Sequence, residues 1–237
     1  ALALYRRAAS LPHLRVSGIA CHIGSQLLDP APMAEAAAKV LGLVDRLAAE
    51  GIRLDHIDLG GGLGIRYDDE TPPSVADYLA PLLKVFEGRS EELCFEPGRS
   101  LVGNAGLLLT RVEYLKPGEE KNFAIVDAAM NDLARPALYD AFHEVVAVTE
   151  RAVVPQRYEI VGPICESGDF LAHDRSLAIA EGDLVALLSA GAYGMTMSSN
   201  YNTRGRAAEV IVEGDALHLV RERESIESLY ALEQALT

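Results

Sequence analysis

The chain has 237 residues, enough to bury one large hydrophobic core or two smaller ones, and its 49% apolar and 24% charged residues are ordinary for a soluble globular protein. The net charge of −14 at pH 7 argues against a nucleic-acid partner, because binding to a phosphate backbone needs clustered lysine and arginine. No apolar run is long enough to span a membrane and the first residues lack the layout of a signal peptide, so no membrane partner is expected.

The first hundred residues alternate between helices and short apolar strands. Helices are predicted over 1–10, 32–50 and 74–86, and strands over 14–21, 54–59 and 93–95. The second helix carries apolar side chains at i, i+3 and i+4 and is followed by Gly51, a residue typical of a helix C-terminus. Ser74 is a suitable N-cap for the third helix, which Pro81 is expected to interrupt. The first strand is apolar enough to be buried on both faces.

A polar cluster follows each of these strands. The clusters are His22-Ile23-Gly24-Ser25, Gly60-Gly61-Gly62 and Glu96-Pro97-Gly98-Arg99, and they begin 38 and 36 residues apart. This interval suits one strand and one helix per step in a parallel sheet, whose ligands bind at the carboxyl ends of the strands. Glycines can present their N–H groups to an anion, most commonly phosphate. The alternatives are a flexible surface turn for the glycines, a buried hydrogen-bonded role for His22, and a turn with a surface ion pair for the third cluster.

The rest of the chain is predicted to be β-rich. Strands are expected over 107–114, 122–127, 145–148, 158–161, 184–189, 209–212 and 217–221, with a closing helix over 226–235. We therefore predict two domains, an α/β segment over residues 1–104 and a β domain over residues 105–237.

The three cysteines stand at unrelated spacings that predict neither a disulfide framework nor a metal site, and a reducing cytoplasm is the expected location. Cys21 and Cys94 are interpreted as small buried hydrophobes. Cys165 instead lies in a glycine-rich loop with two carboxylates, Gly162-Pro163-Ile164-Cys165-Glu166-Ser167-Gly168-Asp169, and is expected to be accessible. A further loop, Gly191-Ala192-Tyr193-Gly194, offers a phenol as a donor to a phosphate or a carboxylate.

These five motifs, in this order, resemble the diaminopimelate decarboxylases, which share the fold type of alanine racemase and ornithine decarboxylase. The loop Cys165-Glu166-Ser167-Gly168-Asp169 distinguishes them from the basic amino acid decarboxylases, which have Cys-Asp there. One departure is Gly205, where the family often has proline. The resemblance implies the C-terminal part of a (β/α)8 barrel, followed by a β-rich domain with a terminal helix.

The resemblance also implies pyridoxal 5′-phosphate as cofactor. Glu96 is expected to pair with the pyridine nitrogen, and His22 to stack on the ring. A carboxylate there keeps the nitrogen protonated, so that the ring can accept the electron pair left when CO₂ departs. The other residues expected at the cofactor are Ser25, Gly60, Gly61, Gly62 and Tyr193 at the phosphate, together with Gly98 and Arg99.

The implied reaction converts meso-2,6-diaminopimelate, a small amino-acid substrate, to L-lysine and CO₂. Cys165 is expected to donate the proton that replaces CO₂, and Glu166 to bind the distal ammonium group. In the family these two residues come from the neighbouring subunit, which implies a homodimer with shared active sites. The residues expected to bind the substrate carboxylate are Arg99, Arg135 and Tyr139, and Tyr193 is expected to be a further substrate-binding residue.

The lysine that joins this cofactor lies, in the family, in a Tyr-Ala-x-Lys-Ala-Asn-like motif that this chain lacks. The lysines present are Lys39, Lys84, Lys116 and Lys121, and none is predicted at a strand end beside the clusters. A complete barrel also needs eight strands and roughly 250 residues. The chain is therefore expected to be the C-terminal part of a longer enzyme and inactive alone.

Three alternatives remain open. The chain could belong to a decarboxylase for another amino acid, or to a non-catalytic relative that keeps the phosphate loop for binding. A phosphate-binding barrel enzyme without pyridoxal is disfavoured, because it leaves Cys165 and Glu166 unexplained.

Overall fold

A computed structural model describes residues 1–236 of the chain. It divides into two compact units, Ala1–Val102 and the residues from Gly103 onward. The first unit contains parallel strands and helices, and the second is mainly β-structure. Within the described residues, no helix is both long and apolar enough to cross a membrane.

The first unit is built on a three-stranded parallel sheet. Its strands β1 (Gly18–Ala20), β2 (His56–Asp58) and β3 (Glu92–Cys94) lie in chain order, as the motif spacing predicts. The strands are shorter than predicted, and burial on both faces is wrong for β1. Ile19 is buried with the helices, but Ala20 is exposed because successive side chains of a strand point to opposite faces.

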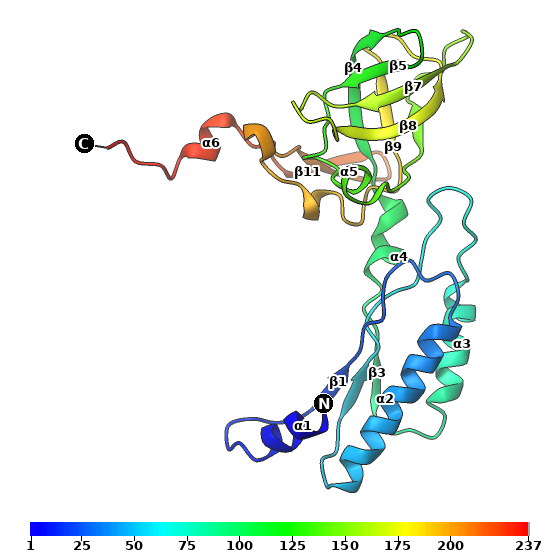
Figure 1. Cartoon of the computed structure of the whole chain (residues 1–237), viewed down its shortest axis with the longest axis vertical. Helices are drawn as coiled ribbons and strands as arrows, with labels where there is room; N and C mark the ends of the chain where they lie inside the picture. The colour runs from blue at the N-terminus through cyan, green and yellow to red at the C-terminus, as the bar shows by residue number, and fades with distance from the viewer. Residues whose placement is uncertain (237) are drawn as a thin grey trace. The chain divides into compact units, whose positions relative to one another are not determined.

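Helices α2 (Ala31–Ala49) and α3 (Val75–Val85) lie side by side (Figure 1) and bury their apolar faces with the sheet. Two shorter helices, α1 (Leu2–Ala9) and α4 (Gly98–Val102), begin and end the unit. Gly51 has the left-handed backbone, φ +84°, that its position after α2 predicts. The core residues shared by these elements include Ile19, Met33, Ala37, Leu41, Val44, Leu47, Ile57, Leu59, Tyr78 and Leu82.

The predicted interruption of α3 at Pro81 is wrong, because the helix continues through the proline. Ser74 caps the helix as predicted, its hydroxyl accepting the N–H of Asp77 at 3.1 Å. An internal proline costs a helix about 3 kcal/mol. Burial contributes about 1.5–3 kcal/mol for each large apolar side chain, and both Tyr78 and Leu82 are buried on either side of Pro81. Tertiary packing therefore outweighs the local penalty.

The second unit is built on a six-stranded sheet in the order β6-β9-β4-β5-β7-β8. The strands are β4 (Leu108–Lys116), β5 (Asn122–Val126), β6 (Val145–Ala147), β7 (Gln156–Val161), β8 (Phe170–Leu177) and β9 (Leu184–Leu187). All neighbours are antiparallel except β5 and β7. Arg175 on β8 donates to the carbonyl of His143, two residues before β6, at 3.1 Å. The two ends of the sheet therefore approach each other, and the sheet is nearly closed around its core.

The unpredicted elements of this unit include the strand β8 and the short helix α5 (Arg135–Tyr139). The β7–β8 pairing contains register shifts, and Asp174 within β8 has φ +56°. Such an irregularity breaks the alternation of apolar and polar residues by which a strand is recognised. The closing helix α6 (Ile226–Tyr230) is shorter than predicted.

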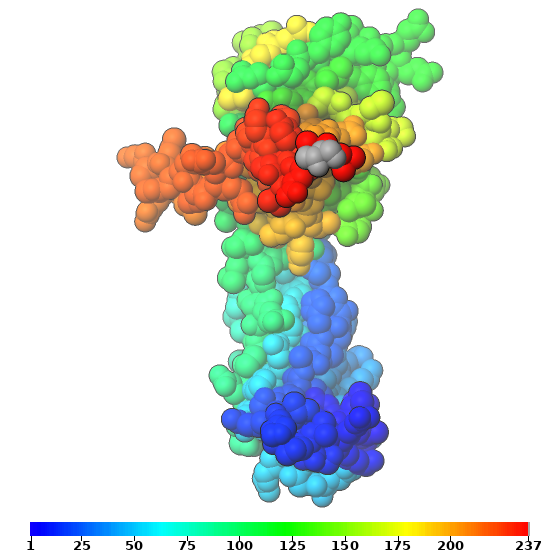
Figure 2. Space-filling model, turned by 90° about the vertical axis from the view of Figure 1, so that its left-hand side faces the viewer, coloured from blue at the N-terminus to red at the C-terminus, as the bar shows by residue number. Residues whose placement is uncertain are grey.

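A separate antiparallel hairpin of β10 (Glu209–Glu213) and β11 (Ala216–Arg221) precedes α6, as predicted. Figure 2 shows it as the orange projection from the second unit, and every residue from Val210 to Arg221 is exposed.

Candidate functional site

The three polar clusters of the first unit meet, as predicted, beyond the carboxyl ends of the strands. The Glu96 N–H donates to the Gly60 carbonyl at 2.9 Å. A Cβ atom added at Gly61 would lie 2.3 Å from the Glu96 carbonyl oxygen, and one added at Gly60 would lie 2.7 Å from His22 Nδ1. Gly60 and Gly62 also have φ of +68° and +128°. Glycines are therefore required both for the backbone conformation and for the close approach of the clusters.

The glycine loop has two unused backbone donors. The Gly60 N–H donates to Asp58 Oδ1 at 2.6 Å. Among residues 1–236, the N–H groups of Gly61 and Gly62 donate to no other group. Unpaired N–H groups from successive residues are suited to an anionic ligand. Because Asp58 accepts from the third N–H group of the triplet, two backbone donors remain for such a ligand.

Arg99, on α4, is held by two hydroxyl groups. Its Nε donates to Ser25 Oγ at 3.1 Å and its Nη1 to the Tyr67 hydroxyl, with the guanidinium also 5.5 Å from the centre of the Tyr67 ring. Since the Ser25 hydroxyl accepts from Arg99, its own proton remains available to a ligand. Tyr67 is buried, and it was not predicted as a site residue. The only signal in the sequence is its position five residues after the glycine triplet. His22, Glu96 and Gly98 are exposed.

The loop between β7 and β8 contains two carboxylates, Glu166 and Asp169, which differ in their exposure to solvent. Cys165 and Glu166 are exposed, so the accessible thiol is confirmed, whereas Cys21 and Cys94 are half-buried rather than buried. Asp169 is 4% exposed. Its two oxygens accept the N–H groups of Met130 at 2.7 Å and Ile164 at 2.8 Å. Asp169 therefore shapes the loop that presents Cys165 and Glu166.

Asp169→Asn is expected to lower the free energy of unfolding by about 2–3 kcal/mol, because an amide nitrogen replaces one of the two buried acceptors and leaves an N–H unpaired. Chemical denaturation followed by circular dichroism measures this change. Asp215→Asn, in the exposed hairpin turn, is the matched control and should leave stability unaltered. An Asp169→Asn variant as stable as the unmodified chain would contradict the structural role of this carboxylate.

Arg135 and Tyr139 stand one turn apart on α5 but in different surroundings. Tyr139 is 66% exposed, whereas Arg135 is 9% exposed. Arg135 Nη1 lies 2.9 Å from Nε2 of the fully buried His143, and His143 Nδ1 lies 2.8 Å from the Leu188 carbonyl oxygen. The carbonyl can only accept, so Nδ1 carries the proton and Nε2 accepts from Arg135. His143 was also missed, because its role depends on contacts with Arg135 and Leu188.

Tyr193 lies in the loop that follows β9, with its side chain 41% exposed. Its φ of +59° is unusual for a bulky residue, and such strain is concentrated at functional sites.

The predicted site residues thus fall into two groups. The first unit brings together His22, Ser25, Gly60, Gly61, Gly62, Glu96, Gly98 and Arg99, and the second unit contains Arg135, Tyr139, Cys165, Glu166 and Tyr193. In the described part of the chain, no group of three or more His, Cys, Asp or Glu side chains is arranged to hold a metal ion.

The chain matches known decarboxylases along nearly its whole length. A family model described as pyridoxal-dependent decarboxylase, C-terminal sheet domain, matches residues 13–191. A diaminopimelate decarboxylase of Pseudomonas aeruginosa is 62% identical over 234 residues, covering 99% of this chain and 56% of that protein. A diaminopimelate decarboxylase of Vibrio cholerae is 56% identical over 234 residues, covering 98% of this chain and 56% of that protein.

A solved structure agrees with these sequence matches. The crystal structure of diaminopimelate decarboxylase from Helicobacter pylori complexed with L-lysine has a TM-score of 0.91 and 40% identity to this chain. It is matched over 98% of this chain and 58% of the H. pylori chain. The chain therefore spans a little more than half the length of these relatives.

Proposed function

This chain belongs to the pyridoxal-dependent decarboxylases, and from that premise we propose that the full-length protein converts meso-2,6-diaminopimelate to L-lysine and CO₂. The observation that carries the proposal is the meeting of the Gly60-Gly61-Gly62 loop with the His22 and Glu96 clusters beyond three parallel strands. The Cys165-Glu166 pair supports the substrate class, because a thiol can donate a proton and a carboxylate can bind a second ammonium group.

The residues of the first unit fit pyridoxal 5′-phosphate. The unpaired N–H groups of Gly61 and Gly62 and the available proton of the Ser25 hydroxyl provide donors for a phosphate. The exposed Glu96 carboxylate is available to a protonated ring nitrogen, and the exposed His22 ring to a flat aromatic face. The cofactor, when bound, supplies a ring that accepts the electron pair released with CO₂. Gly98, Arg99 and Tyr193 complete the residues that we assign to its binding.

The substrate is held by arginine and tyrosine side chains. Arg99, Arg135 and Tyr139 bind its carboxylate, since guanidinium groups donate to both carboxylate oxygens at once. Tyr193 is a further substrate-binding residue. Glu166 binds the distal ammonium group. Cys165 Sγ holds the proton that is delivered to the carbon from which CO₂ has left.

The family resemblance also supports three wider proposals. Residues 1–104 form part of a (β/α)8 barrel that binds the cofactor, and residues 105–237 form the C-terminal domain. Two copies form a homodimer with shared active sites. The protein works in the cytoplasm.

The proposal is tested by measuring CO₂ release from meso-diaminopimelate by the full-length protein and its Cys165→Ala variant. Loss of a positioned proton donor is expected to slow turnover by about 100-fold or more, with affinity for L-lysine little changed. Cys94→Ala is the matched control, since Cys94 is half-buried on β3, and it should affect stability only. Faster CO₂ release from L-lysine or L-ornithine than from diaminopimelate would favour a decarboxylase for another amino acid. Normal turnover by Cys165→Ala would remove the thiol from the reaction.

A further inference from the structure

The proposed function assigns no role to Tyr201, which lies beside Glu166 although 35 residues separate them in the sequence. The Tyr201 hydroxyl donates to Glu166 Oε2 at 3.3 Å. Among the described residues, no other side chain donates to Glu166, whose remaining contact is the Gly168 N–H at 3.5 Å. Glu166 is exposed, and within residues 1–236 Tyr201 is the one side chain placed to orient it.

The loop that carries Tyr201 is fastened to the segment before α5 by Arg204. Arg204 Nε donates to Asn131 Oδ1 at 2.9 Å, and Arg204 Nη2 donates to the Asp127 carbonyl at 2.6 Å. Asn131 is 2% exposed, and its backbone carbonyl accepts the Ser199 N–H at 2.9 Å. A buried asparagine with both its side chain and its backbone engaged is a rigid anchor.

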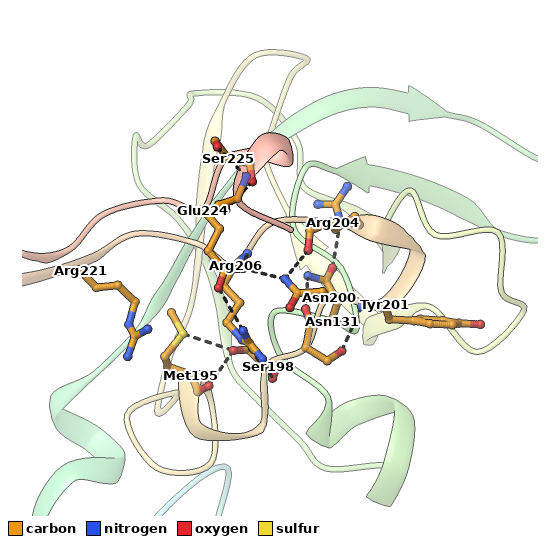
Figure 3. Close-up of polar contacts among 12 residues, drawn as sticks. Asn131, Met195, Ser198, Asn200, Tyr201, Arg204, Arg206, Arg221, Glu224 and Ser225 are labelled. Atoms are coloured by element: carbon orange, nitrogen blue, oxygen red, sulfur yellow. Dashed lines mark hydrogen bonds and ion pairs between the residues drawn. The ribbon is translucent and has the colours of Figure 1, made fainter. Parts of the chain in front are cut away.

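A second set of contacts fixes the same loop from the other side. Asn200 Nδ2 donates to the Arg204 carbonyl at 3.0 Å and to Glu224 Oε2 at 2.6 Å. Glu224 also pairs with Arg206 at 3.0 Å. The backbone N–H of Arg206 and the side chain of Asn200 lower the pKa of Glu224, so this carboxylate stays ionised at neutral pH. Figure 3 shows this network, with the Tyr201 side chain pointing away from it.

The backbone beside Tyr201 is held in an unfavourable conformation. Asn202 and Thr203 have φ of +55° and +59°, and the left-handed region is particularly unfavourable for a β-branched residue such as threonine. Two such residues in succession persist only where surrounding contacts determine the conformation. The contacts of Arg204 and Asn200 are of this kind. They hold the backbone of the loop, and the Tyr201 side chain extends from it to contact Glu166.

We propose that Tyr201 is a positioning residue for substrate specificity: its hydroxyl occupies one oxygen of Glu166 and directs the other toward the distal ammonium group of the substrate. This inference rests on the proposed function, because it acts through the role assigned to Glu166. A carboxylate has two oxygens, so it can accept from the phenol and from an ammonium group at once. Holding the side chain in advance reduces the conformational entropy lost when substrate binds.

The test uses the full-length enzyme and two substrates, meso-diaminopimelate and 2-aminopimelate, which lacks the distal amino group. Tyr201→Phe keeps the ring and removes the hydroxyl. It is expected to lower kcat/KM for diaminopimelate, and the affinity for L-lysine measured by calorimetry, each by about tenfold. The kcat/KM for 2-aminopimelate should not change. In a Glu166→Gln background, Tyr201→Phe should cause no further loss, because its effect passes through the carboxylate.

Tyr114→Phe is the matched control, since Tyr114 is an exposed tyrosine on β4 and should leave all these quantities unaltered. Equal losses for both substrates, or losses that add to those of Glu166→Gln, would show a merely structural role and overturn the inference. An unaltered Tyr201→Phe enzyme would also overturn it. If the unmodified enzyme released no CO₂ from diaminopimelate, the proposed function itself would fail, and the inference with it.

Discussion

Gly61→Ala in the full-length protein is expected to weaken binding of pyridoxal 5′-phosphate roughly 30- to 150-fold, the equivalent of about 2–3 kcal/mol of steric strain. The added Cβ would lie 2.3 Å from the Glu96 carbonyl oxygen, well inside any real contact distance. That oxygen cannot simply move aside. The Glu96 N–H is bonded to the Gly60 carbonyl at 2.9 Å, so relief of the clash must separate the glycine loop from the Glu96 cluster.

Titration of the protein with the cofactor, followed by absorbance, measures this affinity. Gly42→Ala is the matched control, because an added Cβ at Gly42, on α2, meets nothing within 4 Å. It should leave cofactor affinity unchanged and stabilise the helix by roughly 0.5–1 kcal/mol. Unaltered affinity in Gly61→Ala would show that the three clusters do not bind the cofactor as one site.

The 237-residue chain by itself is expected to release no CO₂ from diaminopimelate. Covalent attachment of pyridoxal phosphate needs a lysine at the site. Lys39 and Lys84 are exposed on α2 and α3, Lys116 ends β4, and Lys121 pairs with Glu159 at 2.7 Å. None of the four belongs to the clusters that we assign to the cofactor.

Borohydride reduction and mass spectrometry provide the measurement. The chain alone should yield no reduced cofactor adduct at the clusters, and a polypeptide that also carries the family's lysine motif should yield both the adduct and CO₂. Decarboxylation by the chain alone, with the cofactor attached to one of its four lysines, would contradict our assignment of the site.

The part of the candidate site that could be predicted from the sequence consists of residues that follow strands. Glycine triplets and apolar strands are local patterns, and their spacing predicted that the clusters starting at His22, Gly60 and Glu96 would meet. The structure confirms this because three parallel strands in one sheet place their carboxyl ends together. Which N–H groups of the glycine loop remain unpaired could not be predicted, since this depends on the hydrogen bond from the Gly60 N–H to the Asp58 side chain.

The different burial of the two carboxylates in the Cys165 loop was beyond prediction. Glu166 and Asp169 are both carboxylates in one glycine-rich stretch, yet Glu166 is exposed and Asp169 is buried beneath two backbone N–H groups. One of those N–H groups belongs to Met130, 39 residues away in the sequence. No local pattern distinguishes the two acids, because the distinction arises only when the segment after β5, which contains Met130, lies against this loop.

The sequence by itself determined the order of an α/β segment and a β-rich segment, the parallel strands, and the motifs of the decarboxylase family, because strand periodicity, helix caps and glycine conformation are properties of neighbouring residues. Only the tertiary structure decided that Pro81 stays within a helix, that Arg135 lies against His143, and that Tyr67 and Tyr201 contact site residues. These features depend on side chains brought together from distant parts of the chain. Arg99 and Tyr67 are 32 residues apart, and Tyr201 and Glu166 are 35 apart. Contacts of this kind follow from packing and hydrogen bonding, which the local sequence does not encode.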